Sequence, residues 1–145
     1  MQIIHNSSDI LAGSVDVYVN DGLAIDDFGF REATPFLELP AGVTLNIGIA
    51  AGNSTSVDDT IANFPVVLSA DEKYVVFANG LLTDGYTSNP DGRNTDFTLL
   101  VKTMARESAA GTGVDLFVLH GSTDAPTVDV KVRELNSATI VDDAA

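Results

Sequence analysis

The residues best suited to chemistry lie in two copies of one short motif. His5 is followed four residues later by Asp9, and His120 is followed four residues later by Asp124, with a serine inside each pair. An imidazole that takes a proton beside a carboxylate is an arrangement of general-base and nucleophilic catalysis. A catalytic pair is therefore the first hypothesis that these residues raise.

The repetition of the motif favours a structural role instead. Residues 3–19 and 118–132 align over the histidine, the aspartate and a following Val-Asp-Val stretch, about 115 residues apart. Both histidines stand where a strand enters an Asp-containing loop. We expect each to donate to that loop or to its aspartate, which caps the turn. The same alignment pairs Asp16 with Asp129, and we expect both to face solvent or to hold a neighbouring loop.

The longest stretch without strand signals is residues 84–96, which we predict to be a binding loop. Tyr86 and Arg93 could stack on and hydrogen-bond a glycan or a partner protein. The predicted binding residues are Asp84, Tyr86, Asp91, Arg93 and Asp96. The oxygens of Asp84, Asp91, Asn94 and Asp96 also suit calcium, but their spacing is not that of a known calcium loop. We therefore assign no metal and no cofactor, and keep a calcium-stabilised module as the third alternative.

Short strands must position these residues. Val15, Val17 and Val19 alternate with polar residues, a turn follows at residues 20–22, and Leu45, Ile47 and Ile49 alternate in the same way. Further strands are expected at Ile25–Phe30, Thr34–Leu39, Ile61–Leu68, Tyr74–Ala78 and Phe97–Lys102. About seven such strands without a long amphipathic helix predict an all-β antiparallel sandwich. Tyr74 stands either in a tyrosine corner, with its hydroxyl bonded to backbone just upstream, or as an ordinary strand residue.

The repeat also predicts the domain organisation. We expect one module at 1–107, a linker at 108–113 and the first strands of a truncated second copy at 114–145. Because two or three strands cannot form a core, the second copy should pair with the first module or with a neighbouring chain, which would give a homodimer through C-terminal strands.

Composition narrows the functional classes. A formal charge of −14 and sixteen Asp against five Glu favour many loops and exclude a nucleic-acid partner. The chain has no cysteine, no stretch long enough to span a membrane and no signal segment, and we expect a signal segment to have been removed.

The His-x-Ser-x-Asp motif and the Val-Asp-Val stretch resemble the opening of the bacterial family called domain of unknown function 4397. Residues 36–42 (Phe-Leu-Glu-Leu-Pro-Ala-Gly) and 68–76 are similar to two further segments of that family. The first copy departs from it, with Asp9-Ile10-Leu11-Ala12-Gly13-Ser14 where Asp-Ala-Pro is typical, whereas the second keeps Asp124-Ala125-Pro126. The resemblance implies an immunoglobulin-like sandwich in secreted or cell-surface bacterial proteins, usually in tandem, and it implies no activity.

Together these features predict a non-catalytic, exported or cell-surface module used for adhesion to a glycan or surface protein. The alternative is a purely structural spacer repeat of a larger surface protein. A concave end-loop pocket lined by both Tyr86 and Arg93 would favour binding, whereas flat polar ends would favour the spacer.

Overall fold

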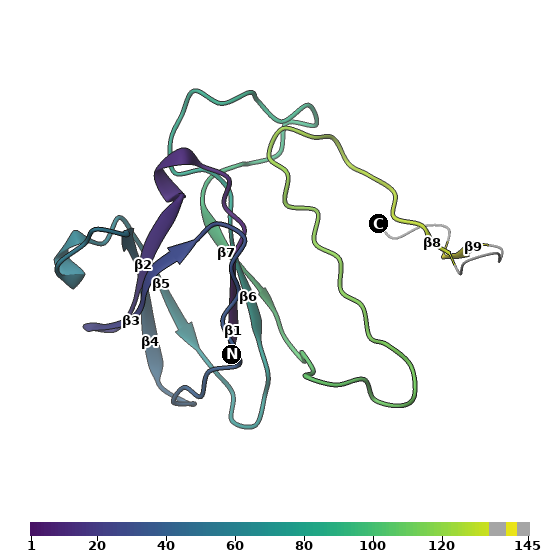
Figure 1. The fold of residues 1–145 in the computed structure, drawn as a ribbon, viewed down its shortest axis with the longest axis horizontal. Helices are drawn as coiled ribbons and strands as arrows, with labels where there is room; N and C mark the ends of the chain where they lie inside the picture. Colours follow the sequence, from purple (N-terminus) through teal and green to yellow (C-terminus); the bar gives the residue numbers. More distant parts are fainter. Residues whose placement is uncertain (134–138, 142–145) are drawn as a thin grey trace.

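The computed structural model describes residues 1–133 and 139–141, in which seven strands form two packed sheets and two further strands form a separate pair (Figure 1). One sheet has the strand order β3-β2-β4-β5 and the other has the order β1-β6-β7. The strands are β1 (Gln2–His5), β2 (Ser14–Val19), β3 (Gly22–Gly29), β4 (Thr44–Ala51), β5 (Ala62–Val67), β6 (Val75–Asn79) and β7 (Thr98–Lys102). Neighbours are antiparallel except β1 and β6, which are parallel. The predicted β-sandwich is confirmed.

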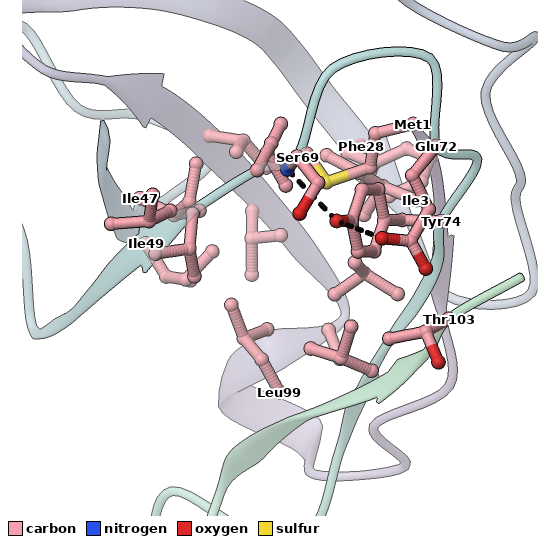
Figure 2. A pocket seen from close by; sticks show the side chains of 18 residues that line it. Met1, Ile3, Phe28, Ile47, Ile49, Ser69, Glu72, Tyr74, Leu99 and Thr103 are labelled. Carbon is pink, nitrogen blue, oxygen red and sulfur yellow. Dashed lines mark hydrogen bonds between the residues drawn. The ribbon is translucent and has the colours of Figure 1, made fainter. Parts of the chain in front are cut away.

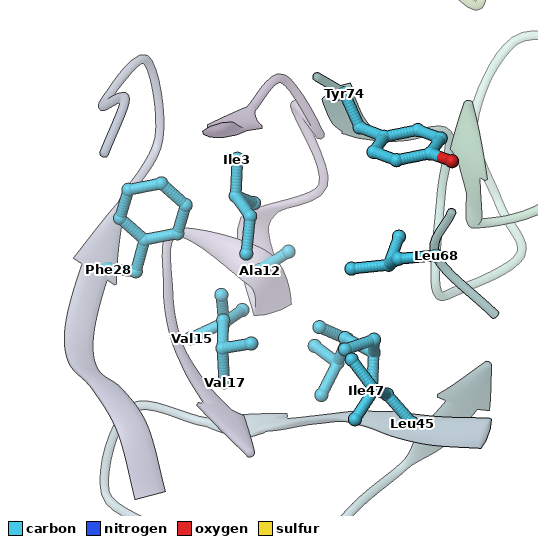
Figure 3. Packing of buried hydrophobic residues seen from close by; sticks show 10 residues of the cluster. Ile3, Ala12, Val15, Val17, Phe28, Leu45, Ile47, Leu68 and Tyr74 are labelled. Atoms are coloured by element: carbon cyan, nitrogen blue, oxygen red, sulfur yellow. The ribbon is translucent and has the colours of Figure 1, made fainter. Parts of the chain in front are cut away.

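Alternation of apolar residues places the core between the sheets. Val15 and Val17 of β2 and Ile47 and Ile49 of β4 are at most 3% exposed, and they face Ile3 of β1 (Figure 3). Side chains of successive strand residues point to opposite faces, so every second residue enters this layer. The hydrophobic pattern of the sequence therefore fixes which face of each strand is buried.

Turn residues set the β2–β3 hairpin. The strands end at Val19 and begin again at Gly22, which leaves a two-residue loop. Asn20 adopts a φ of 54°, a left-handed conformation that asparagine tolerates better than most residues. Further along, β3 contains a bulge opposite Asp16, where the register shifts between Val15 and Val17.

The expected strand at Thr34–Leu39 does not form. This segment runs beside the free edge of β1, and Thr34 and Leu37 donate to the carbonyls of Ile3 and Met1. Pro35 has no N–H, so it cannot extend a ladder there. The segment therefore covers the edge of β1 through backbone hydrogen bonds without forming a strand. It has one isolated β-bridge to β1, between Ala33 and Ile4.

In the residues that the structure describes, the second copy pairs with neither of the two sheets. Residues 103–131 contain no strand, and β8 (Val132–Arg133) and β9 (Thr139–Val141) pair only with each other. The strands expected at the start of the second copy are thus absent from residues 114–131. Residues 134–138 and 142–145 of the predicted second copy lie outside the described residues, and the domain limits stay a prediction. No helix in the described ranges is long and apolar enough to cross a membrane.

Candidate functional site

His5 lies at the end of β1 with both ring nitrogens occupied. Its side chain is buried, and Nε2 lies 2.6 Å from the carbonyl oxygen of Ala12. A carbonyl can only accept, so Nε2 donates, and Nδ1 accepts the N–H of Ser7 at 3.3 Å. Burial lowers the pKa of His5, which keeps the ring neutral. This histidine holds the β1–β2 loop, as the structural interpretation of the repeat predicts.

Asp9 ties that loop to the β6–β7 connection. One carboxylate oxygen caps the 3₁₀ helix Ile10–Ala12 by accepting the N–H of Leu11 at 2.8 Å. The other accepts the N–H groups of Leu82 and Thr83 and the hydroxyl of Thr83, each at 2.9 Å. Burial alone would raise the pKa of Asp9, but these hydrogen bonds outweigh it and hold the pKa below its ordinary value.

Asp16 performs the same task on the other sheet. It is 1% exposed and accepts the N–H of Asp27 in the β3 bulge at 2.9 Å. It also accepts the N–H and the hydroxyl of Ser54, in the loop after β4. Burial opposes ionisation, yet the hydrogen bonds from Ser54 and Asp27 lower the pKa of Asp16. Asp16 therefore holds a neighbouring loop and does not face solvent.

The second copy forms the local hydrogen bonds of the motif but not the long-range hydrogen bonds that Asp9 and Asp16 accept in the first copy. His120 Nε2 lies 3.0 Å from the carbonyl oxygen of Pro126, and Ser122 donates to Asp124 at 2.8 Å. His120, Asp124 and Asp129 are all exposed. The histidine-to-carbonyl contact thus forms within the motif itself, whereas the long-range partners of Asp9 and Asp16 have no equivalents here.

Tyr74 stands at the start of β6 in the tyrosine-corner arrangement (Figure 2). Its hydroxyl accepts the N–H of Ser69 at 2.9 Å and donates to Glu72 at 2.8 Å. The ring is 6% exposed and belongs to the core cluster. The buried Tyr74 side chain therefore holds the turn before β6 through its two hydrogen bonds.

The long loop holds the opening of the second copy. Asn89, which is 9% exposed, donates its side-chain amide to the carbonyls of Thr123 and Ala125, both at 3.1 Å. Its Oδ1 accepts the N–H groups of Asp91 and Arg93, so Asn89 also shapes its own loop. Asn89 is the residue that sequence reasoning missed, because Asn-Pro-Asp-Gly reads as an ordinary turn.

Asp91 and Arg93 meet at Thr127. Asp91 accepts the N–H of Thr127 at 2.6 Å and its hydroxyl at 2.7 Å, and Arg93 donates to the same hydroxyl oxygen at 2.7 Å. The hydrogen bonds from Thr127, with the nearby Arg93 cation, lower the pKa of Asp91 below its ordinary value. Two of the predicted binding residues thus bind a segment of the same chain.

The other predicted binding residues lie apart from this contact. Tyr86 and Asp84 line a hollow of about 310 Å³, while Arg93 lines a different one of about 170 Å³ beside His120. Asp96 borders both. The hydroxyl of Tyr86 accepts the N–H of Ile10 at 3.0 Å. Tyr86 and Arg93 therefore line different hollows.

A calcium site gains no support from this geometry. In the part of the chain that the structure describes, no three His, Asp or Glu side chains are grouped so that they could hold a metal ion. Asn94 accepts the N–H of Asp96 at 2.8 Å, which closes a local turn.

Residues 104–133, which we call the tail, follow β7, and the part around Phe117 runs beside the outer face of the β1-β6-β7 sheet (Figure 1). The Phe117 ring lies 5.7 Å from that of Phe77 on β6, and the Lys102 ammonium lies 5.9 Å from it. Leu116 and Val118, which alternate with Phe117, are 71% and 59% exposed. The segment therefore contacts the sheet on one side and leaves two apolar side chains uncovered on the other.

An apolar cavity of about 450 Å³ lies between the two sheets (Figure 2). Its walls are aliphatic side chains from both sheets, and its polar members, Ser69, Glu72, Tyr74 and Thr103, belong to the turn before β6 and the end of β7. A sealed void of this size would cost about 11 kcal/mol at ~24 cal/mol per Å³. That approaches the whole stability of a domain, so the cavity cannot be an empty, closed space. The sequence carries no signal for it, because the residues of its wall are those of an ordinary core.

Comparisons with known proteins agree with the motif-based resemblance. The family profile described as "Domain of unknown function (DUF4397)" matches residues 1–131. The match extends past the predicted linker to Lys131 and so includes the opening of the predicted second copy. Comparisons with curated proteins and with solved structures give no match. Because the profile covers most of the chain, this protein belongs to the DUF4397 family.

Proposed function

We propose that this protein is a non-catalytic repeat of a larger exported or cell-surface protein, in which loop 84–96 fastens the start of the following repeat. The observation that carries the proposal is the set of hydrogen bonds from Asn89, Asp91 and Arg93 to residues 123–127. A loop that is engaged by its own chain is less available to a glycan or a foreign protein. The spacer alternative therefore takes precedence over adhesion.

Close packing next to the loop supports this proposal. A Cβ added to Gly121 would lie 2.4 Å from side-chain atoms of Asn6 and of Asn79, so a larger residue would have to displace these side chains. Such a close approach of the backbone indicates a specific, tightly packed contact, in contrast to a loose surface contact of the tail. The contact joins the opening loops of both copies to the end of β6.

The alternation along residues 116–119 supports it as well. In the alignment with the first copy, Val118 corresponds to Ile3, which is buried in the core, and Phe117 corresponds to Gln2 on the outer face. Phe117, although 54% exposed, contacts Phe77 of the first module, while Val118, at 59% exposed, would be free to enter the core of a second module. One strand would thus serve both repeats.

Hydrogen exchange tests the fastening directly. In the wild-type chain the N–H of Thr127 should be protected, because Asp91 accepts it at 2.6 Å. Asp91→Ala should remove this protection, and the charge-matched control Asp84→Ala, in the same loop, should keep it. Gly121→Ala should also release the segment, whereas Gly113→Ala, with open space around its Cβ position, should not. Equal exchange of Thr127 in all four variants would refute the fastening role.

Glycan or protein binding remains the second candidate, at the Tyr86 hollow. Tyr86 is 42% exposed there beside the carboxylates of Asp84 and Asp96, and an aromatic face with oxygen acceptors suits a sugar. A glycan array with the wild-type chain and with Tyr86→Ala tests it. Loss of a specific signal in the variant would support this function, and an array without signal would dismiss it.

A further inference from the structure

The cavity between the sheets has the composition of a ligand site. Pockets that bind small molecules typically enclose about 300–1,000 Å³ and combine apolar walls with a few polar groups, and this cavity holds about 450 Å³. Its polar members belong to the chain segments around Tyr74, as Figure 2 shows. They accompany an aliphatic wall that includes Val17, Ile49 and Val76.

Water is a poor occupant of such a space. A buried water needs two to four polar partners, and the aliphatic walls provide none. The exposed apolar tail is not the occupant either, because no residue of 104–133 lines the cavity and Phe117 packs on the opposite face of the sheet. The occupant that suits these walls is a hydrocarbon chain from another molecule.

The polar side of the cavity decides the head group. A second hollow of about 620 Å³ shares Ser69, Glu72 and Tyr74 with the cavity, so the two adjoin. Its lining includes four carboxylates, those of Glu38, Asp71, Glu72 and Glu107, against two cations, the Lys73 side chain and the Met1 ammonium. Lys73 forms an ion pair with Glu107, which leaves three carboxylates against the Met1 ammonium. A cation would be attracted to this rim and an anion repelled.

We propose that the protein binds an amphiphile with one hydrocarbon chain and a positively charged head. The chain enters the cavity between the sheets, and the head lies among the carboxylates around Glu72. This binding is independent of the fastening by loop 84–96, because the cavity and the loop share no residue.

Fluorescence of the neutral probe N-phenyl-1-naphthylamine tests the site. The probe should brighten on mixing with the wild-type chain. Three decyl compounds, used below their micelle concentrations, should then displace it in the order decyltrimethylammonium, decanol, decanoate. A wild-type chain that leaves the probe dark would overturn the proposal, and equal displacement by all three compounds would overturn the assignment of the head group.

Two variants locate the site, with one matched control. Val101 of β7 lines the cavity and is 48% exposed, so Val101→Trp should close its mouth and reduce probe fluorescence at least several-fold. Val43 is equally exposed, at 50%, but does not line the cavity, so Val43→Trp should bind the probe like the wild type. If Val101→Trp does not fold, Ala78→Leu fills the cavity from within and should have the same effect. Unchanged probe binding in a folded variant of either kind would refute the proposed location.

Discussion

Asp9 and Thr83 are 74 residues apart in sequence, yet Thr83 donates both its N–H and its hydroxyl to one oxygen of the Asp9 carboxylate, each at 2.9 Å. This contact joins the loop after β1 to the loop after β6. It also explains why an aspartate stands at this place in the motif, since only an ionised carboxylate accepts at every lone pair without presenting a donor.

Replacement of Asp9 by Asn should therefore destabilise the fold. Asparagine keeps the shape but turns an N–H₂ group toward N–H donors, and hydrogen bonds to charged groups contribute about 1.5–3 kcal/mol each. We expect Asp9→Asn to lower the free energy of unfolding by about 2–4 kcal/mol in urea titrations. Asp124→Asn is the matched control in the second copy, where the side chain is exposed, and should change stability by less than about 0.5 kcal/mol. Equal effects of the two substitutions would contradict the structural role of Asp9.

The buried His5 should make the fold sensitive to mild acid. Burial lowers its pKa in the folded state below the ordinary value of 6.5, so the unfolded chain takes up the proton first. Stability from neutral His5 is complete above pH 6.5 and decreases as the pH falls through the folded-state pKa, by up to about 1.4 kcal/mol per pH unit. Asp9 and Asp16 have lowered pKa values, so their protonation changes the stability only at more acidic pH. Their stabilisation is present above their ordinary pKa of 3.8 and is lost as the pH falls below it.

Unfolding free energies at pH 7.5 and 5.5 test this sensitivity. The wild-type chain should lose stability over this interval, and His5→Gln should lose much less, because no imidazole remains to be protonated. His120→Gln should behave like the wild type, since His120 is exposed. A His5→Gln variant with the full wild-type dependence would assign the acid sensitivity to other groups.

The alternation of apolar and polar residues predicts most of the strands of this fold, but it does not predict which distant segments come into contact. The alternating valines before Gly22 and the alternating residues around Ile47 identify β2 and β4, because the apolar residues that enter the core lie on one face of each strand. The same patterning predicts a strand at residues 34–39, where Pro35 prevents the ladder. The apolar pattern describes side chains only, so it does not show that Pro35 lacks the backbone N–H that a ladder needs. The prediction would have been correct if Pro35 had counted for more than its apolar neighbours.

The candidate site shows the same division. The repeat identifies His5, Asp9 and Asp16 as parts of the fold, because the motif recurs wherever a module begins. Their partners at Thr83 and Ser54 depend on how distant loops return to the motif, and short-range spacing contains no information on that. Likewise, Asp91 and Arg93 stand out as polar loop residues, but their shared partner Thr127 is defined only by the path of the tail.

The tyrosine corner should contribute measurably to stability. Tyr74→Phe removes the acceptor for the N–H of Ser69 and the donor to Glu72, at a ring that is 6% exposed. We expect a loss of about 1–2 kcal/mol, the usual effect of an unsatisfied buried hydrogen-bonding group. Tyr86→Phe removes a comparable hydroxyl, bonded to Ile10 N–H at an exposed site, and water can replace it. Urea unfolding should thus separate the two variants, and a larger loss in Tyr86→Phe would show that the corner is unimportant.

Gly80 should be the least replaceable glycine of the loop region, and Gly85 provides its control. Both adopt positive φ angles, 93° and 99°, which side chains rarely tolerate. A Cβ at Gly80 would lie 2.3 Å from the carbonyl oxygen of Asp96, a backbone atom that cannot move without displacing the start of β7. A Cβ at Gly85 meets nothing within 4 Å. Gly85→Ala should therefore cost about 1–2 kcal/mol of backbone strain alone, and Gly80→Ala should cost at least twice as much. Thermal melts of the two variants test this difference in stability. Equal shifts in Tm would mean that backbone strain alone accounts for the loss of stability in both variants, and that the close contact between Gly80 and Asp96 relaxes freely.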